Sequence, residues 1–141
     1  MLQIFIRPRK KDLVPQAQFY PREVKQDGNW NQLAGPENSA SPLTIRQAAY
    51  LFDAHFAKET NVTLPQIEGF EPWLYVMAGS LEVAGQKLTK GQAVTGTKEE
   101  LAQLKVEPET SLVLLMADLI ADMTYAGKFS GIKRFEYVTK K

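Results

Sequence analysis

The 141-residue sequence contains no cysteine and only one histidine, His55. The absence of cysteine excludes disulfide bonds, thiolate metal sites and a cysteine nucleophile. It also fits the reducing cytoplasm, where disulfides are rare, and we expect a cytoplasmic protein.

The sequence also lacks a strong charge of either sign and a long hydrophobic run. Seventeen Lys and Arg against sixteen Asp and Glu give a net charge of +1, which provides no field to attract nucleic acid or an anionic membrane. The longest apolar run, Leu112–Ala117, is far shorter than the ~20 residues of a membrane span. The basic residues 7–11 follow the N-terminal apolar stretch, the reverse of a secretory signal. We therefore expect neither nucleic acid nor a membrane as a partner.

What is present fits one β-rich domain. The length is that of a single domain, and 44% hydrophobic residues suffice for a core. Eight Pro and nine Gly are spread along the chain, as expected for short strands joined by turns.

Alternating polar and apolar residues locate these strands. Tyr50, Phe52, Ala54 and Phe56 share one parity, which places them on one face of a strand. For residues 98–104, a helical turn is the alternative to a strand. The predicted strands are Leu2–Arg7, Trp30–Ala34, Leu43–Arg46, Ala48–Phe56, Asn61–Leu64, Trp73–Ala78, Leu81–Ala84, Gln86–Leu88, Gln92–Thr95, Ala102–Val106, Ser111–Leu119 and Ile132–Val138.

Several segments resemble a known family. The hairpin Trp73–Val83, followed by Leu88–Val94, is similar to the central strands of the C-terminal half of pirin-like, quercetinase-like bicupins. Leu2–Pro8 and Leu114–Leu119 resemble the strands that open and close that half, and Tyr125–Phe129 resembles its tail. The resemblance implies an all-β fold: a single cupin barrel, the double-stranded β-helix or jelly roll.

We expect one domain, residues 1–141, with three parts. Residues 1–42 form an N-terminal strand and arm, residues 43–119 the barrel, and residues 120–141 a C-terminal tail. In the family two such barrels share one chain, and a metal on histidines and a glutamate belongs to the N-terminal barrel. This chain resembles the C-terminal barrel alone.

The metal-binding motifs of cupins are degenerate here. With Gly79 as the last glycine of the first motif, the glutamate position holds Pro72. The two histidine positions hold Gln66 and Glu68 with the shorter motif spacing, or Pro65 and Ile67 with the longer one. The histidine position of the second motif holds Val94. A transition-metal site needs about three or four nitrogen, oxygen or sulfur ligands on one centre. A histidine-based site is therefore not expected.

Gln66, Glu68 and Glu71 lie at or beside these motif positions, in a loop that would enter the barrel mouth. Their oxygen atoms suit Mg, Ca or Mn, or the anchoring of a ligand. The alternative is a solvated loop that connects two strands.

His55 lies outside both motifs, opposite in parity to Phe52 and Phe56. It is a candidate general base or a hydrogen-bonded structural histidine, and no neighbour in sequence supplies a nucleophile. The strand–turn–helix context of a nucleophile elbow is absent at Ser39, Ser41, Ser80 and Ser111. We predict no catalytic residue.

Trp73, Tyr75 and Met77 share one parity of their strand. They either line an apolar pocket in the barrel or belong to the core or to a dimer seam. The sequence does not decide which parity faces the interior.

We expect a non-catalytic, metal-free domain without cofactors. It would act as a homodimer, with a partner cupin domain, or by binding a small apolar ligand in the barrel. The candidate ligand-binding residues are Gln66, Glu68, Glu71, Trp73, Tyr75, Met77 and His55. The alternative is a metal-dependent quercetinase- or dioxygenase-like enzyme with a degenerate oxygen-ligand site.

Overall fold

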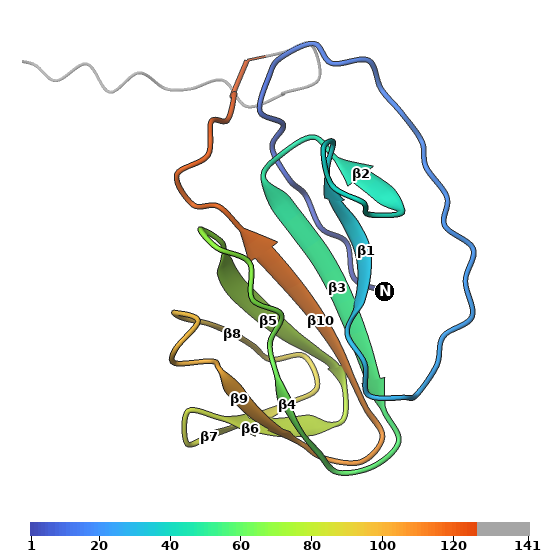
Figure 1. Ribbon diagram of the computed structural model, residues 1–141, viewed down its shortest axis with the longest axis vertical. Coiled ribbons are helices and arrows are strands. Elements are labelled where there is room, and N and C mark those ends of the chain that lie inside the picture. The colour runs from blue at the N-terminus through green and yellow to red at the C-terminus, as the bar shows by residue number, and fades with distance from the viewer. Residues whose placement is uncertain (127–141) are drawn as a thin grey trace, which may run out of the picture.

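Two β-sheets face each other in the computed structural model, which describes residues 1–126 (Figure 1). These residues contain ten strands and no helix. The strands are β1 (Asn31–Pro36), β2 (Leu43–Ile45), β3 (Ala49–Phe56), β4 (Thr60–Thr63), β5 (Glu71–Ala78), β6 (Ser80–Val83), β7 (Gln86–Thr89), β8 (Ala93–Thr95), β9 (Gln103–Val106) and β10 (Thr110–Ala117).

The larger sheet has six strands in the order β2-β1-β3-β10-β5-β8, and the smaller has four in the order β4-β9-β6-β7. All neighbours are antiparallel except β1 and β2. The last long strand, β10, lies between β3 and β5 and pairs with both.

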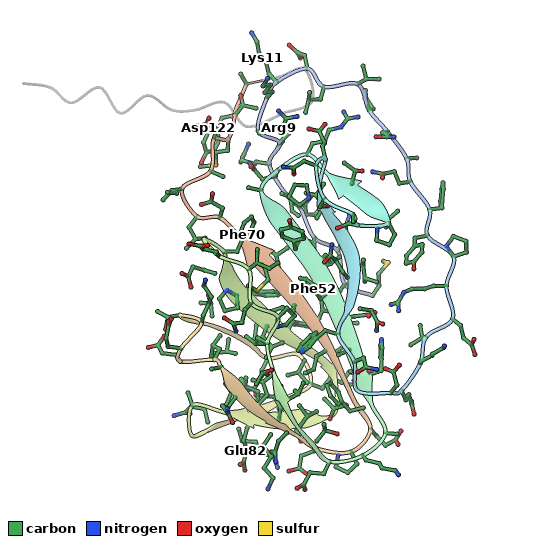
Figure 2. The ribbon with its side chains drawn as sticks, in the orientation of Figure 1. Arg9, Lys11, Phe52, Phe70, Glu82 and Asp122 are labelled. Atoms are coloured by element: carbon green, nitrogen blue, oxygen red, sulfur yellow. The ribbon has the colours of Figure 1, made fainter. Side chains whose placement is uncertain are left out.

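Side chains fill the space between the two sheets. Alternate residues of each long strand point inward, because successive side chains of a strand lie on opposite faces. Figure 2 shows Phe52 between the sheets and Glu82 at the surface. The core contains Phe52, Ala54, Phe56, Leu64, Leu74, Val76, Leu81, Val83, Leu101, Leu104, Val106, Leu112, Leu114 and Met116.

The all-β prediction is confirmed, and the strands predicted between Trp30 and Leu119 are present with small shifts at their ends. Strand β1 lies between β2 and β3 and pairs with both. The larger sheet therefore begins at Asn31, whereas the predicted barrel begins at Leu43. Both readings of residues 98–104 are partly right. The Leu101 amide donates to the Thr97 carbonyl at 3.2 Å in a helical-type turn, and β9 begins at Gln103.

The predicted strand Leu2–Arg7 is wrong. Leu2, Ile4 and Ile6 are partly buried while Gln3 and Phe5 are exposed, so one side of this segment packs as a strand would. No sheet ladder forms, however, and the segment is the extended start of an N-terminal arm. The arm continues as the blue chain that sweeps around the larger sheet before β1 (Figure 1).

The predicted last strand, Ile132–Val138, lies outside the described residues. Among residues 1–126, no helix has the length and hydrophobicity to cross a membrane.

Gly79 allows the sharp turn from β5 to β6. Its φ is +77°, in the left-handed region, and a Cβ built on it would lie 2.7 Å from the Thr110 Cα and 2.8 Å from the Glu109 carbonyl oxygen. Gly91 also has a positive φ, of +87°, but nothing lies within 4 Å of the position that its Cβ would take.

We predict that Gly79→Ala lowers the free energy of unfolding by about 3 kcal/mol, because left-handed strain adds to a backbone clash. Gly91→Ala, which brings the strain alone, should cost about 1 kcal/mol. Urea denaturation of both variants measures the difference. Equal losses would show that close packing at Gly79 is not what holds the turn.

Candidate functional site

The outer face of the larger sheet carries the aromatic residues of β5. Leu74 and Val76 are fully buried in the core, so Trp73, Tyr75 and Met77 take the opposite parity and are partly exposed. The rings of Trp73 and Tyr75 stack with centroids 5.7 Å apart and planes 10° apart. The side chains of Trp73, Tyr75 and Met77 therefore lie on the outside of the barrel rather than in a lumen.

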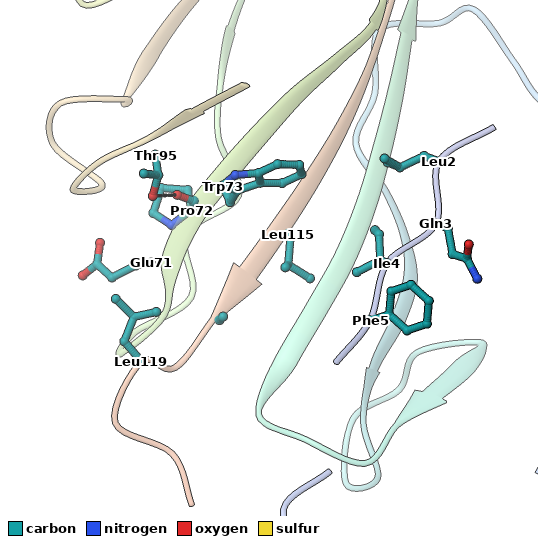
Figure 3. A pocket seen from close by; sticks show the side chains of 11 residues that line it. Leu2, Gln3, Ile4, Phe5, Glu71, Pro72, Trp73, Thr95, Leu115 and Leu119 are labelled. Carbon is teal, nitrogen blue, oxygen red and sulfur yellow. Dashed lines mark hydrogen bonds between the residues drawn. The ribbon is translucent and has the colours of Figure 1, made fainter. Parts of the chain in front are cut away.

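An apolar groove of about 410 Å³ lies on this outer face, where the N-terminal arm passes over the sheet (Figure 3). Trp73 of β5 and Leu115 of β10 are paired in register and line the groove. Phe5 and Leu119, also in the lining, are 86% and 77% exposed. We call this the outer groove.

Glu71 is the acidic residue of the outer groove. Its Oε2 atom is buried and has no hydrogen-bond partner among the described residues. A buried carboxylate oxygen without a donor is costly, since it has lost water and gained nothing in return. The outer groove therefore offers an unsatisfied carboxylate oxygen as a hydrogen-bond acceptor in mainly apolar surroundings.

His55 lies on the same face of the sheet, outside the groove lining, and both its ring nitrogens have partners. Its Nδ1 lies 2.8 Å from Ser111 Oγ of β10, and its Nε2 lies 3.2 Å from Asp53 Oδ2. Asp53 and His55 are two residues apart on β3, and Ser111 is the residue paired with His55 in the β3–β10 register.

Asp53 ties the N-terminal arm to the sheet. Its buried carboxylate forms an ion pair with Arg22 of the arm and accepts a hydrogen bond from Asn31 Nδ2 at 3.2 Å. The arm is held further by Gln18, whose side chain donates to the Thr44 carbonyl and accepts from the Thr44 amide. The extended arm thus has fixed attachment points although it forms no strand.

Comparison with known proteins places the chain in a family. Residues 32–119 match the family model of the quercetinase C-terminal cupin domain. The chain belongs to this cupin family. A search of the curated proteins found no match.

Solved structures with a similar fold include a bacterial pirin, YhhW from Escherichia coli, in complex with nickel(II). At 14% identity the TM-score is 0.67, with 78% of this chain and 47% of the pirin covered. A quercetin 2,3-dioxygenase from Acinetobacter baumannii gives a TM-score of 0.54 at 19% identity, with 67% of this chain and 35% of the dioxygenase covered. The chain thus spans about half the length of the pirin and about a third of the length of the dioxygenase.

The residues present do not fit the metal site that the cupin family implies. Gln66 and Glu68 are exposed, and the Gln66 amide donates to the Leu64 carbonyl at 3.2 Å. Within residues 1–126, no group of three His, Asp or Glu side chains is placed to hold a metal ion. We therefore derive no reaction step through a metal.

The predicted site residues of this cupin domain are divided between separate places. Glu71 and Trp73 meet in the outer groove, where Tyr75 stacks on Trp73. His55 joins a different cluster, with Ser111 and Asp53.

Sequence reasoning missed Asp53 and Ser111 as partners of His55. The shared parity of Asp53 and His55 was a usable signal, because residues two apart on a strand lie on one face. Ser111 is 56 positions from His55, and no local pattern gives that register.

We predict that Asp53→Ala lowers the free energy of unfolding by about 2 kcal/mol, since it removes charged hydrogen bonds from a side chain only 9% exposed. The matched control is Glu37→Ala, which breaks the ion pair of Arg9 and Glu37, whose side chains are 39% and 42% exposed. It should cost less than about 1 kcal/mol.

Limited trypsin digestion gives a second measurement, because Asp53→Ala should release the arm and speed cleavage at Lys10, Lys11 and Lys25. Unchanged cleavage would contradict the role of Asp53 as the anchor of the arm.

Proposed function

We propose that this cupin domain acts by associating with a second cupin barrel through the outer groove, in the first place with another copy of itself. One observation carries the proposal. Phe5 and Leu119 stand almost fully exposed at the edge of an apolar groove that also contains Trp73. Large apolar side chains grouped on a surface mark interaction sites more often than isolated ones do.

The packing of the core supports an external binding surface. Among residues 1–126, fourteen buried apolar residues form one cluster between the sheets, which leaves the outer face as the surface for binding. Tryptophan and other aromatic residues are the side chains that most often anchor protein interfaces, and Trp73 lies in the groove with Phe5.

The two-barrel architecture that the sequence resembles supports a barrel as the occupant. The domain spans 47% of the pirin to which it is similar, and the resemblance of the sequence is to one half of a two-barrel chain. A stable interface buries about 800 Å² on each partner. A second barrel of equal size offers a surface of that extent.

We predict that the protein is a dimer in sedimentation velocity at tens of micromolar, and that Phe5→Glu with Leu119→Glu makes it a monomer. Both side chains are exposed, so the substitutions spare the core while they place charge in the interface. Val24→Glu is the matched control, because Val24 is exposed on the arm but does not line the groove. A wild-type protein that stays monomeric at high concentration contradicts self-association.

A small apolar ligand with a hydrogen-bond donor is a second candidate occupant, favoured by Glu71. The groove volume of about 410 Å³ lies within the ~300–1,000 Å³ usual for small-molecule sites, and the unpartnered Glu71 Oε2 is ready to accept a donor. Ligand binding would take place on the outer face rather than in the barrel.

For this candidate we expect phenethylamine to bind about tenfold more tightly than ethylbenzene, because only the amine donates to a carboxylate. Isothermal titration compares the two ligands, and Glu71→Ala should abolish the preference. A preference that persists in Glu71→Ala would place the amine elsewhere.

A further inference from the structure

We infer that Ser111 is a nucleophile activated by His55 and that the outer face carries a metal-independent site for small activated acyl groups. This goes beyond the proposed association, since it uses different residues. The Ser111, His55 and Asp53 side chains form a continuous hydrogen-bonded chain across β10 and β3. We call it the Ser111 relay.

The protonation pattern of the relay follows from what each group can donate. The Asp53 carboxylate only accepts hydrogen bonds, so in the neutral imidazole Nε2 carries the proton and donates it over 3.2 Å. His55 Nδ1 is then unprotonated and accepts from the Ser111 hydroxyl over 2.8 Å. A serine that donates to a histidine, itself oriented by a carboxylate, is the arrangement that activates a hydroxyl for acyl transfer.

The surroundings hold this arrangement in place. Asn31 donates to Asp53 Oδ1, and Arg22 pairs with Oδ2, so the carboxylate that positions His55 is itself oriented from two sides. A nucleophile must also be reached: His55 has 19% of its side chain exposed, and Ser111 is partly exposed.

An irregularity in the sheet lies directly beside Ser111. Ser111 pairs with Ala78 of β5 while the next residue, Leu112, pairs with Val76, so Met77 has no partner on β10. Such bulges occur often next to active sites, because they re-aim a side chain and interrupt the ladder.

The proposed reaction transfers an acyl group from a small activated ester. Ser111 Oγ bonds to the ester carbonyl carbon, its proton passes to His55 Nδ1, and the bond to the alkoxide leaving group breaks as that group takes the proton. Water, deprotonated by the same nitrogen, then attacks the acyl carbon and releases the carboxylic acid and the free Ser111 hydroxyl. Asp53 is a positioning residue, because it acts through His55.

A small alkyl fluorophosphonate is the probe, because it traps the first step. The oxygen–phosphorus bond forms, fluoride leaves, and the hydroxyl proton passes through His55 to water. We expect a single adduct per chain, located at Ser111 by peptide mass spectrometry. Ser39 and Ser41 are internal controls, since their hydroxyl oxygens lie 2.9 Å apart and bond to each other, while the ring nitrogens of His55 bond to Ser111 and Asp53.

We expect His55→Gln to slow labelling of Ser111 about 100-fold, and Ser111→Ala to remove the adduct and the slow hydrolysis of p-nitrophenyl acetate. A purely structural relay would leave the labelling rate of Ser111 equal to that of Ser39 and Ser41 in the wild type. That equality, an adduct elsewhere, or labelling indifferent to His55→Gln would each overturn the inference. The comparison of labelling rates at Ser111, Ser39 and Ser41 uses the wild-type protein, so it tests the inference even if the His55→Gln variant does not fold.

Discussion

The pairing of β10 with both β3 and β5 is the constraint on which the rest of this domain depends. All eight residues of β10 have partners on β3, and most have partners on β5. Leu112, Leu114 and Met116 consequently point into the core, while Ser111 and Leu115 point outward. A slip of one residue would exchange these two sets, so burial of the core fixes what the outer face presents.

The same register places two separate features along β10. Leu115 meets Trp73 in the outer groove, near the end of β10, and Ser111 meets His55 near its beginning. The N-terminal arm contacts both the groove and the Ser111 relay. Its first residues line the groove, and its Arg22 forms an ion pair with Asp53. The arm is therefore part of the proposed functional surface, although it forms no strand.

Much of the fold could be predicted from the sequence because alternation of residues is a local property. The parity of Tyr50, Phe52 and Phe56 predicts β3, which the structure contains. The degenerate cupin motifs predict only that a histidine-based metal site is not expected. The strand predicted at Leu2–Arg7 is wrong because apolar Leu2 and Ile4 alternate with other residues as in a strand, but no neighbouring strand pairs with the segment. Formation of a sheet ladder depends on such neighbours, which a local sequence pattern does not contain.

The candidate sites were only half predictable for the same reason. Glu71 can be predicted because it lies beside a family motif, and Trp73 because it shares one parity of an apolar strand. The contact of Ser111 with His55 depends instead on strand register across 56 positions. Which parity of β5 faces outward also required the packing of the opposite sheet, since the strand is apolar on both sides.

Hydrogen–deuterium exchange at low and high protein concentration tests the association most directly, because it locates the buried surface in the full chain. The account predicts that concentration protects residues 1–5, 71–73 and 115–119, which contain or flank the groove lining, and leaves the smaller sheet unchanged. Protection confined to the smaller sheet, or none at any concentration, would contradict it.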